Sequence, residues 1–108
     1  MHTLKLNPKA LEDLKAIKSH ITEELENPTA ASQTILSIIE SYERLKDFPS
    51  LGGSLSTKID VKTDYRFLVS GEYIIFYKFD SHYVYIYRIL YGKRDYLNIL
   101  FKENDMLH

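Results

Sequence analysis

The sequence predicts an α+β domain in which a helical hairpin packs against one face of an antiparallel sheet. Three observations support this fold class. Before residue 49, apolar residues recur every three or four positions, which is typical of amphipathic helices. After residue 64, apolar and polar residues alternate with a period of two, which is typical of strands. The 108 residues are 44% hydrophobic and 27% charged, a composition that suits one globular domain over residues 1–108.

The amino-terminal half is expected to form a short strand and two helices. Thr3–Leu6 alternates apolar and polar residues, as a strand does. Asn7-Pro8 predicts a helix start, because asparagine accepts a free backbone N–H and proline suits the first turn. Asn27-Pro28 ends this helix and begins the next, which stops at Phe48-Pro49. The short link predicts an antiparallel hairpin. Its apolar stripes are Leu11, Leu14, Ile17, Ile21 and Leu25, and Ile35, Ile38, Ile39, Tyr42 and Leu45.

The carboxy-terminal half is expected to form three strands and a short helix. Ser50–Lys58 contains two glycines and three serines, so we expect a loop there. Tight turns join the strands that follow, which must therefore be antiparallel. Gly92 ends the last strand, and Tyr96–Lys102 has helical character. The expected strands are Tyr65–Val69, Tyr73–Phe79 and Tyr83–Tyr91, which completes the order β-α-α-β-β-β with a short terminal helix.

The two faces of the predicted sheet differ in chemistry. Along Tyr83–Tyr91, strict alternation places Val84, Ile86, Arg88 and Leu90 on an aliphatic face and the tyrosines on the other. We expect the aliphatic face to pack on the helices and the tyrosine face to stay partly open. Tyrosine combines a broad apolar ring with a polar tip, which suits a surface that a partner covers. The alternative is that tyrosine is only a good strand residue. Tyr73, Tyr77, Tyr85, Tyr87 and Tyr91 are assigned to this aromatic surface.

Composition and charge exclude several classes of function. The chain has no cysteine, so disulfides and thiolate metal sites are absent. Its four histidines lie far apart, so we expect no metal site and no cofactor. No segment approaches the ~20 apolar residues of a membrane span, and no signal-peptide core is recognised, so we expect no membrane partner and a cytoplasmic protein. The net charge of −1 argues against autonomous nucleic-acid binding.

A compact basic corner follows the last predicted strand. Gly92 breaks the strand pattern, and Lys93 and Arg94 come directly after it. A strand that ends in a glycine turn holds such side chains at a fixed place on a rigid sheet, so we expect both to be exposed.

Two further arginines have alternative interpretations. Arg66 and Arg88 either bind a partner or pair with Asp64 or Asp95 to hold strand ends together. For Arg88 the structural pairing is favoured. Asp95 is expected to cap the terminal helix.

Three segments together resemble the carboxy-terminal half of a RelE/ParE-type toxin. They are TDYRFLVSGEY with Arg66, the aromatic strand YIIFYKF, and YVYIYRILYGKRD. The order and spacing are closer to the ParE branch, and the amino-terminal half shares the outline of a strand and a helical hairpin. The resemblance implies the toxin of a type II toxin–antitoxin system, associated with growth inhibition and plasmid stabilisation. It also implies a cognate antitoxin that wraps the toxin in a hetero-oligomer.

The two branches of this superfamily act differently, and the residues favour one of them. RelE-like members cut mRNA on the ribosome with cationic and tyrosine side chains, whereas ParE-like members poison DNA gyrase. A central RelE-type arginine is replaced here by Ile74, and a cationic pair by Tyr65 and Phe67. A metal-free nuclease needs such donors for the charge on the scissile phosphate. Gyrase inhibition is therefore predicted, with a ribosome-dependent mRNA endoribonuclease as the alternative.

These comparisons give two sets of candidate site residues. The expected target or antitoxin contacts are Arg66, Tyr73, Tyr77, Tyr85, Tyr87, Arg88, Tyr91, Lys93 and Arg94. The candidates for the endoribonuclease are Arg66, Lys93, Arg94, Tyr91 and Tyr96. In the family comparison Arg94 matches the basic corner, and Tyr91 stands where many ParE-like chains have histidine. A third interpretation is a decayed toxin that only binds its antitoxin.

Overall fold

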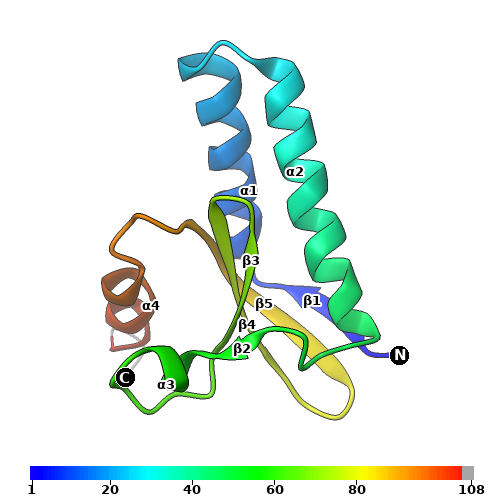
Figure 1. Ribbon diagram of the computed structural model, residues 1–108, viewed down its shortest axis with the longest axis vertical. Coiled ribbons are helices and arrows are strands. Elements are labelled where there is room, and N and C mark those ends of the chain that lie inside the picture. The colour runs from blue at the N-terminus through cyan, green and yellow to red at the C-terminus, as the bar shows by residue number, and fades with distance from the viewer. Residues whose placement is uncertain (106–108) are drawn as a thin grey trace.

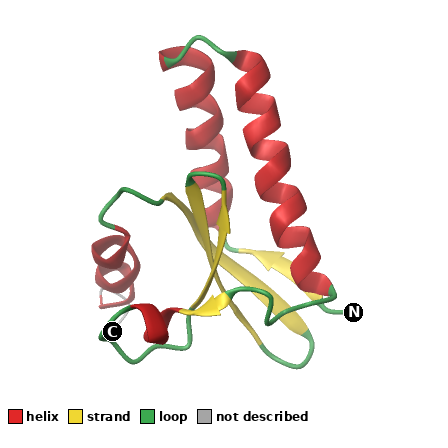
Figure 2. Ribbon diagram, in the orientation of Figure 1, coloured by secondary structure: helices red, strands yellow, loops and turns green. Residues whose placement is uncertain are grey.

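The computed structural model describes residues 1–105 and has the predicted α+β architecture (Figures 1 and 2). Its helices are α1 (Pro8–Ser19), α2 (Pro28–Glu43), α3 (Leu55–Lys58) and α4 (Tyr96–Asp105). Its strands are β1 (Thr3–Leu6), β2 (Gly53–Ser54), β3 (Arg66–Ser70), β4 (Tyr73–Phe79) and β5 (Tyr83–Tyr91). The segment 50–58, expected as a loop, therefore contains β2 and α3. Both are too short to give a periodic sequence signal.

The five strands form one sheet in the order β1-β5-β4-β3-β2. The meander β3-β4-β5 is antiparallel, as predicted from its tight turns. The sheet is mixed, however, because β1 pairs in parallel with β5 in the register Thr3↔Tyr83. The helical hairpin supplies the long crossover connection that a parallel pair requires.

The helical hairpin begins at the predicted asparagine–proline pairs. The Asn7 side chain accepts a hydrogen bond from the Lys9 backbone N–H at 2.9 Å, and the Asn27 side chain accepts from that of Ala30 at 3.1 Å. After Ser19, the first helix continues as a π-helical turn over His20–Glu24. Figure 1 shows that the tip of the hairpin projects beyond the turn between β3 and β4.

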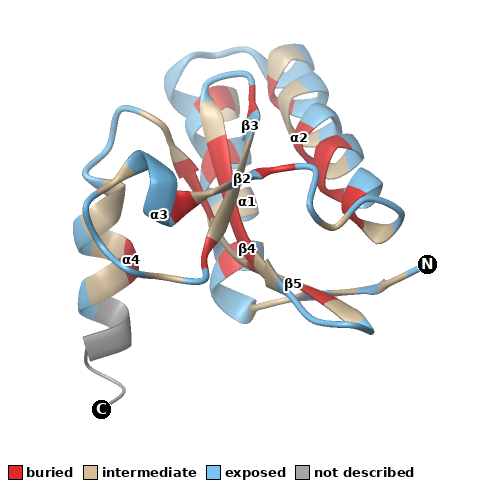
Figure 3. Cartoon of the chain, turned by 60° about the horizontal axis from the view of Figure 1, so that its bottom comes forward, coloured by how far each residue is buried: buried red, intermediate tan, exposed pale blue. Residues whose placement is uncertain are grey.

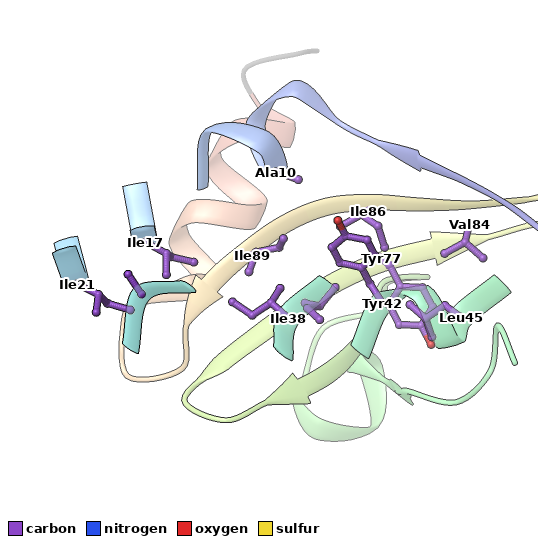
Figure 4. Close-up of a cluster of buried hydrophobic side chains, with 12 residues drawn as sticks. Ala10, Ile17, Ile21, Ile38, Tyr42, Leu45, Tyr77, Val84, Ile86 and Ile89 are labelled. Atoms are coloured by element: carbon purple, nitrogen blue, oxygen red, sulfur yellow. The ribbon is translucent and has the colours of Figure 1, made fainter. Parts of the chain in front are cut away.

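A hydrophobic core lies on each face of the sheet. The hairpin core joins α1 and α2 to the sheet, and Figure 4 shows Ile17, Ile38, Tyr77 and Ile86 within it. The opposite core contains Leu55, Tyr65, Ile74, Phe76, Leu90 and Leu100. It lies beneath α3 and α4 (Figure 3). The expectation of helices on one face and a partly open face on the other is therefore wrong for the part of the sheet that these two helices cover.

A β-bulge in β5 explains why the predicted faces are wrong. Phe76 pairs with Arg88 and Tyr77 pairs with Ile86, which leaves an extra residue in β5. An extra residue reverses the alternation beyond it. Val84 and Ile86 face the hairpin before the bulge and Ile89 after it, while Leu90 joins the opposite core. The tyrosines of β4 also face the hairpin, and Tyr77 is fully buried.

Candidate functional site

A cleft of about 630 Å³ opens between the hairpin and the ends of β4 and β5. Ile17 and Ile21 line it from the helix and its π-helical turn, and Tyr73 and Tyr91 line it from the sheet. Glu72 and Arg94 also line it. The cleft thus combines apolar side chains with a carboxylate and a guanidinium, as binding pockets commonly do.

Two tyrosines form the sheet wall of the cleft. Tyr73 and Tyr91 are directly opposite in the β4–β5 register, and their ring centroids lie 5.8 Å apart at 61°. Burial raises the pKa of the Tyr73 hydroxyl, and the charges of Glu72 and Tyr91 raise it further. Its hydroxyl is therefore protonated at neutral pH. It can donate or accept a hydrogen bond but is poorly suited to act as a general base.

Backbone hydrogen bonds fix the basic corner beside these tyrosines. The N–H of Gly92 donates to the Glu72 carbonyl at 2.8 Å, and that of Arg94 donates to the Tyr91 carbonyl at 3.0 Å. The exposure predicted for Lys93 and Arg94 is confirmed.

The structure thus brings together Tyr73, Tyr91 and Arg94 of the predicted contacts, with Lys93 next to them in the chain. Sequence reasoning missed Glu72 and His20, which also line the cleft. His20 lies one helical turn from Ile17, so the helix period was an available signal. Glu72 directly precedes Tyr73, but only the folded sheet reveals its hydrogen bond to Gly92.

Arg88 lies elsewhere, in an ion pair with Asp13 of α1. Its Nε donates to Oδ2 and its terminal nitrogen to Oδ1, both at 2.8 Å, and the side chains are only 12% and 11% exposed. The backbone N–H of Ile89 donates to the same carboxylate at 2.9 Å. Asp13 therefore ties α1 to β5 next to the bulge, and Arg88 has a structural role.

The expected arginine partners have other contacts. Asp64 pairs with Lys78, with Oδ1 and Nζ 3.0 Å apart. Asp95 directly precedes α4, where its carbonyl accepts from the Ile99 backbone N–H and its carboxylate from the Asn98 side chain. The predicted arginine pairings with Asp64 and Asp95 are therefore wrong.

Arg66 and Tyr77 together hold the loop between α2 and β2. The Arg66 guanidinium donates to the Ser50 carbonyl at 3.1 Å and also to the Gly52 carbonyl. The Tyr77 hydroxyl donates to the Pro49 carbonyl at 2.7 Å and accepts from the Gly52 N–H at 3.0 Å. In this conformation Tyr77 has no exposed surface to offer a partner.

We expect Tyr77→Phe to lower the free energy of unfolding by about 1–3 kcal/mol, because it leaves a buried N–H and a carbonyl without their partner. Urea denaturation measures this change. Tyr83→Phe is the matched control, since Tyr83 is half-buried, and its change should stay within about 0.5 kcal/mol. Equal stability of the two variants would contradict the proposed role of the Tyr77 hydroxyl.

The remaining aromatic candidates lie away from the cleft. The Tyr85 hydroxyl donates to Asp80 at 3.2 Å in the turn between β4 and β5. Tyr87 packs edge-on against Tyr65, and the Tyr96 ring packs on Phe76 with centroids 5.2 Å apart. The Tyr96 N–H donates to the Arg94 carbonyl at 2.8 Å, but its ring packs on Phe76, and the Arg66 guanidinium contacts loop carbonyls. Among the described residues, no group of three or more acidic, histidine or cysteine side chains is placed to hold a metal ion.

Comparisons with known proteins agree with this architecture. The chain superposes on a solved structure described as the chromosomal ParDE TA system from P. aeruginosa, with a TM-score of 0.71 and 23% sequence identity. The match covers 86% of this chain and 98% of the other. No curated protein sequence matches the chain. Within residues 1–105, no helix is both long and apolar enough to cross a membrane.

A family model described as the ParE toxin of the type II toxin–antitoxin system parDE matches residues 4–96. The matched span includes the hairpin, the basic corner and all of the sheet except Thr3, the first residue of β1. The chain therefore belongs to the ParE toxin family of type II toxin–antitoxin systems.

Proposed function

We propose that this chain arrests bacterial growth by binding and inhibiting DNA gyrase, and that it acts in the cytoplasm. Membership of a type II toxin family implies an antitoxin partner, and we propose that the antitoxin neutralises the toxin by covering the surface that contacts gyrase. The observation that carries the proposal is the cleft, where two tyrosines and the exposed Arg94 meet an apolar floor. Aromatic rings and arginine are the side chains enriched at the centres of protein interfaces.

The alternative, cleavage of mRNA on the ribosome, has less support from the geometry. A nuclease without a metal must gather cationic and acid–base groups around one phosphate. Of the candidates, Arg66 donates to loop carbonyls and Tyr96 packs on the opposite core. Lys93, Arg94 and Tyr91 remain near one another. The raised pKa of Tyr73 makes it a poor base for the same reaction.

We expect Arg94→Glu to weaken gyrase inhibition by at least about tenfold, because it reverses the cation at the rim of the cleft. Supercoiling of relaxed plasmid by purified gyrase, titrated with the chain, measures the effect. Lys62→Glu is the control, since Lys62 is also exposed but lies before β3, away from the cleft.

The rival activity is measured in parallel by mapping transcript 5′ ends on translating ribosomes. Unchanged supercoiling at toxin concentrations that stop growth would overturn the gyrase proposal. New cuts in translated mRNA would then establish the endoribonuclease, and Arg94→Glu would test whether that activity uses the same corner.

A further inference from the structure

A second surface of distinct chemistry lies on the sheet face opposite the hairpin. Lys5 of β1 is in register with Tyr85 of β5, which is in register with Lys78 of β4. Leu4, Leu6 and Tyr77 belong to the hairpin core, so alternation places both lysines on the other face. The three residues form a row across three strands. At ~4.8 Å per strand, the lysine backbones lie ~10 Å apart.

Aromatic rings hold both lysine side chains close to the sheet. The Lys5 Nζ lies 4.4 Å from the Tyr83 ring centroid, and the Tyr83 and Tyr85 rings are 5.8 Å apart. The Lys78 Nζ lies 4.4 Å from the Tyr65 ring and 5.3 Å from that of Tyr87. We call Lys5, Lys78, Tyr83, Tyr85 and Tyr87 the lysine–tyrosine patch. Cation–π contacts restrict the two ammonium groups before any ligand arrives, so less entropy is lost on binding.

The patch is open to solvent. Lys5 is exposed, and Tyr83, Tyr85 and Lys78 are half-buried. The carboxylate that pairs with Lys78 belongs to Asp64, whose side chain is 79% exposed. The Lys78 side chain is 29% exposed, but the Asp64 carboxylate is well solvated, so a carboxylate of a partner can take its place on Lys78.

The hydroxyl of Tyr85 is oriented by the neighbouring turn. It donates to Asp80 Oδ2 at 3.2 Å, and Asp80 Oδ1 accepts from the backbone N–H groups of His82 and Tyr83, both at 2.8 Å. These backbone hydrogen bonds hold the pKa of Asp80 below its usual value. The acceptor is therefore ionised at neutral pH, and its hydrogen bond restrains the side chain of Tyr85, whose backbone lies between those of the two lysines.

The chemistry of the patch favours an acidic peptide over a nucleic acid. Binding a nucleic-acid backbone requires several cations along a track, and the whole chain has a net charge of −1. Two lysines whose backbones lie ~10 Å apart, with a tyrosine between them in the register, instead suit carboxylates on one short polypeptide segment with small or apolar residues between them.

We propose that the lysine–tyrosine patch binds an acidic segment of the antitoxin, as a contact separate from the cleft. This inference rests on the proposed function for the identity of the partner. It assigns a role to Lys5, Lys78 and Tyr83, which lie outside the contacts predicted from sequence. Its consequence is that antitoxin binding and target inhibition can be separated by substitution.

The first test uses the purified chain labelled with ¹⁵N and a ten-residue peptide of alternating glutamate and alanine. We expect amide shifts centred on Lys5, Lys78, Tyr83 and Tyr85, and binding that weakens as salt is added. Lys5→Glu/Lys78→Glu should weaken binding at least about tenfold, because two attractive charges become repulsive. The matched control Lys15→Glu/Lys18→Glu makes the same charge change at two exposed lysines of α1, on the hairpin side of the sheet, and should bind within about twofold of the parent chain.

Three results would overturn the proposal. They are equal binding of a glutamine–alanine peptide, shifts centred on Tyr73, Tyr91 and Arg94 of the cleft, and tighter binding of a ten-nucleotide single strand at the patch. If Lys5→Glu/Lys78→Glu unfolds, Lys5→Gln/Lys78→Gln, which only removes the charges, carries the same test. Gyrase inhibition by the patch variants is measured in parallel and should equal that of the parent chain. If the parent chain itself does not inhibit gyrase, that result counts against the proposed function and not against the lysine–tyrosine patch.

Discussion

Asp13→Ala should lower the free energy of unfolding by about 3–5 kcal/mol, as the removal of one partner of a buried ion pair does. The carboxylate accepts from the Arg88 guanidinium and from the Ile89 N–H, and it is nearly nine-tenths buried. Its loss removes the bidentate carboxylate contact of the Arg88 guanidinium and leaves the β5 backbone with an unsatisfied N–H beside the bulge. Since chains of this size have total stabilities of about 5–15 kcal/mol, the change removes a large share.

Urea denaturation followed by circular dichroism measures this loss. Glu12→Ala is the matched control, because Glu12 precedes Asp13 and its only described ion pair, with Lys9, is exposed and 3.9 Å long. Its effect should stay within about 0.5 kcal/mol. If the two variants unfold at the same urea concentration, the ion pair does not stabilise the fold as we describe.

A double variant separates the two contributions of Asp13 to stability, its ion pair with Arg88 and its hydrogen bond from the Ile89 N–H. Asp13→Ala/Arg88→Met removes the buried charge as well as its partner, so stability should partly recover. The cost that remains includes that of the unsatisfied Ile89 N–H, about 1–3 kcal/mol. Full recovery would mean that the backbone hydrogen bond contributes nothing.

The elements that were predicted correctly from sequence are those with local signals. The asparagine–proline pairs at residues 7–8 and 27–28 carry their own capping chemistry, so both helix starts were predictable. The turns between β3, β4 and β5 are short enough to leave no alternative to antiparallel pairing. The basic corner after Gly92 was likewise predicted from neighbouring residues alone.

The features that were missed depend on residues far apart in the chain. One bulged residue in β5 reverses the faces of the strand, and nothing in the alternation of Tyr83–Tyr91 indicates it. Asp13 and Arg88 are 75 positions apart, and Asp13 has the sequence context of an ordinary solvated helix residue. The cleft is built from the same kind of distant pairing, since Tyr73 and Tyr91 meet the hairpin only after the sheet has formed.

Gly52→Ala is expected to be the second severe substitution, with a loss of about 3–5 kcal/mol from overpacking and lost hydrogen bonds together. An added Cβ would lie 2.3 Å from the Phe67 carbonyl oxygen and 2.8 Å from the Tyr77 hydroxyl. The first neighbour is backbone of β3 and the second is fully buried, so neither can move freely. The loop must shift instead, which breaks its hydrogen bonds with Tyr77 and Arg66.

Gly71→Ala is the informative control. Gly71 has a φ of +59°, and an added Cβ there would meet nothing within 4 Å. Its cost should be that of left-handed backbone alone, about 1–2 kcal/mol. Backbone conformation alone would make Gly71→Ala the more destabilising substitution, whereas packing makes Gly52→Ala the more destabilising one. Thermal and urea unfolding of both variants show which of the two loses more stability.

The effects of Gly52→Ala and Tyr77→Phe on the free energy of unfolding should not be additive. Gly52→Ala already displaces the N–H that donates to the Tyr77 hydroxyl, so Tyr77→Phe has less to remove in that background. The hydroxyl would also no longer crowd the added methyl group. We therefore expect the loss of unfolding free energy in the double variant Gly52→Ala/Tyr77→Phe to be smaller than the sum of the two single losses, by about 1 kcal/mol or more. Strict additivity would show that Tyr77 and Gly52 stabilise the loop independently.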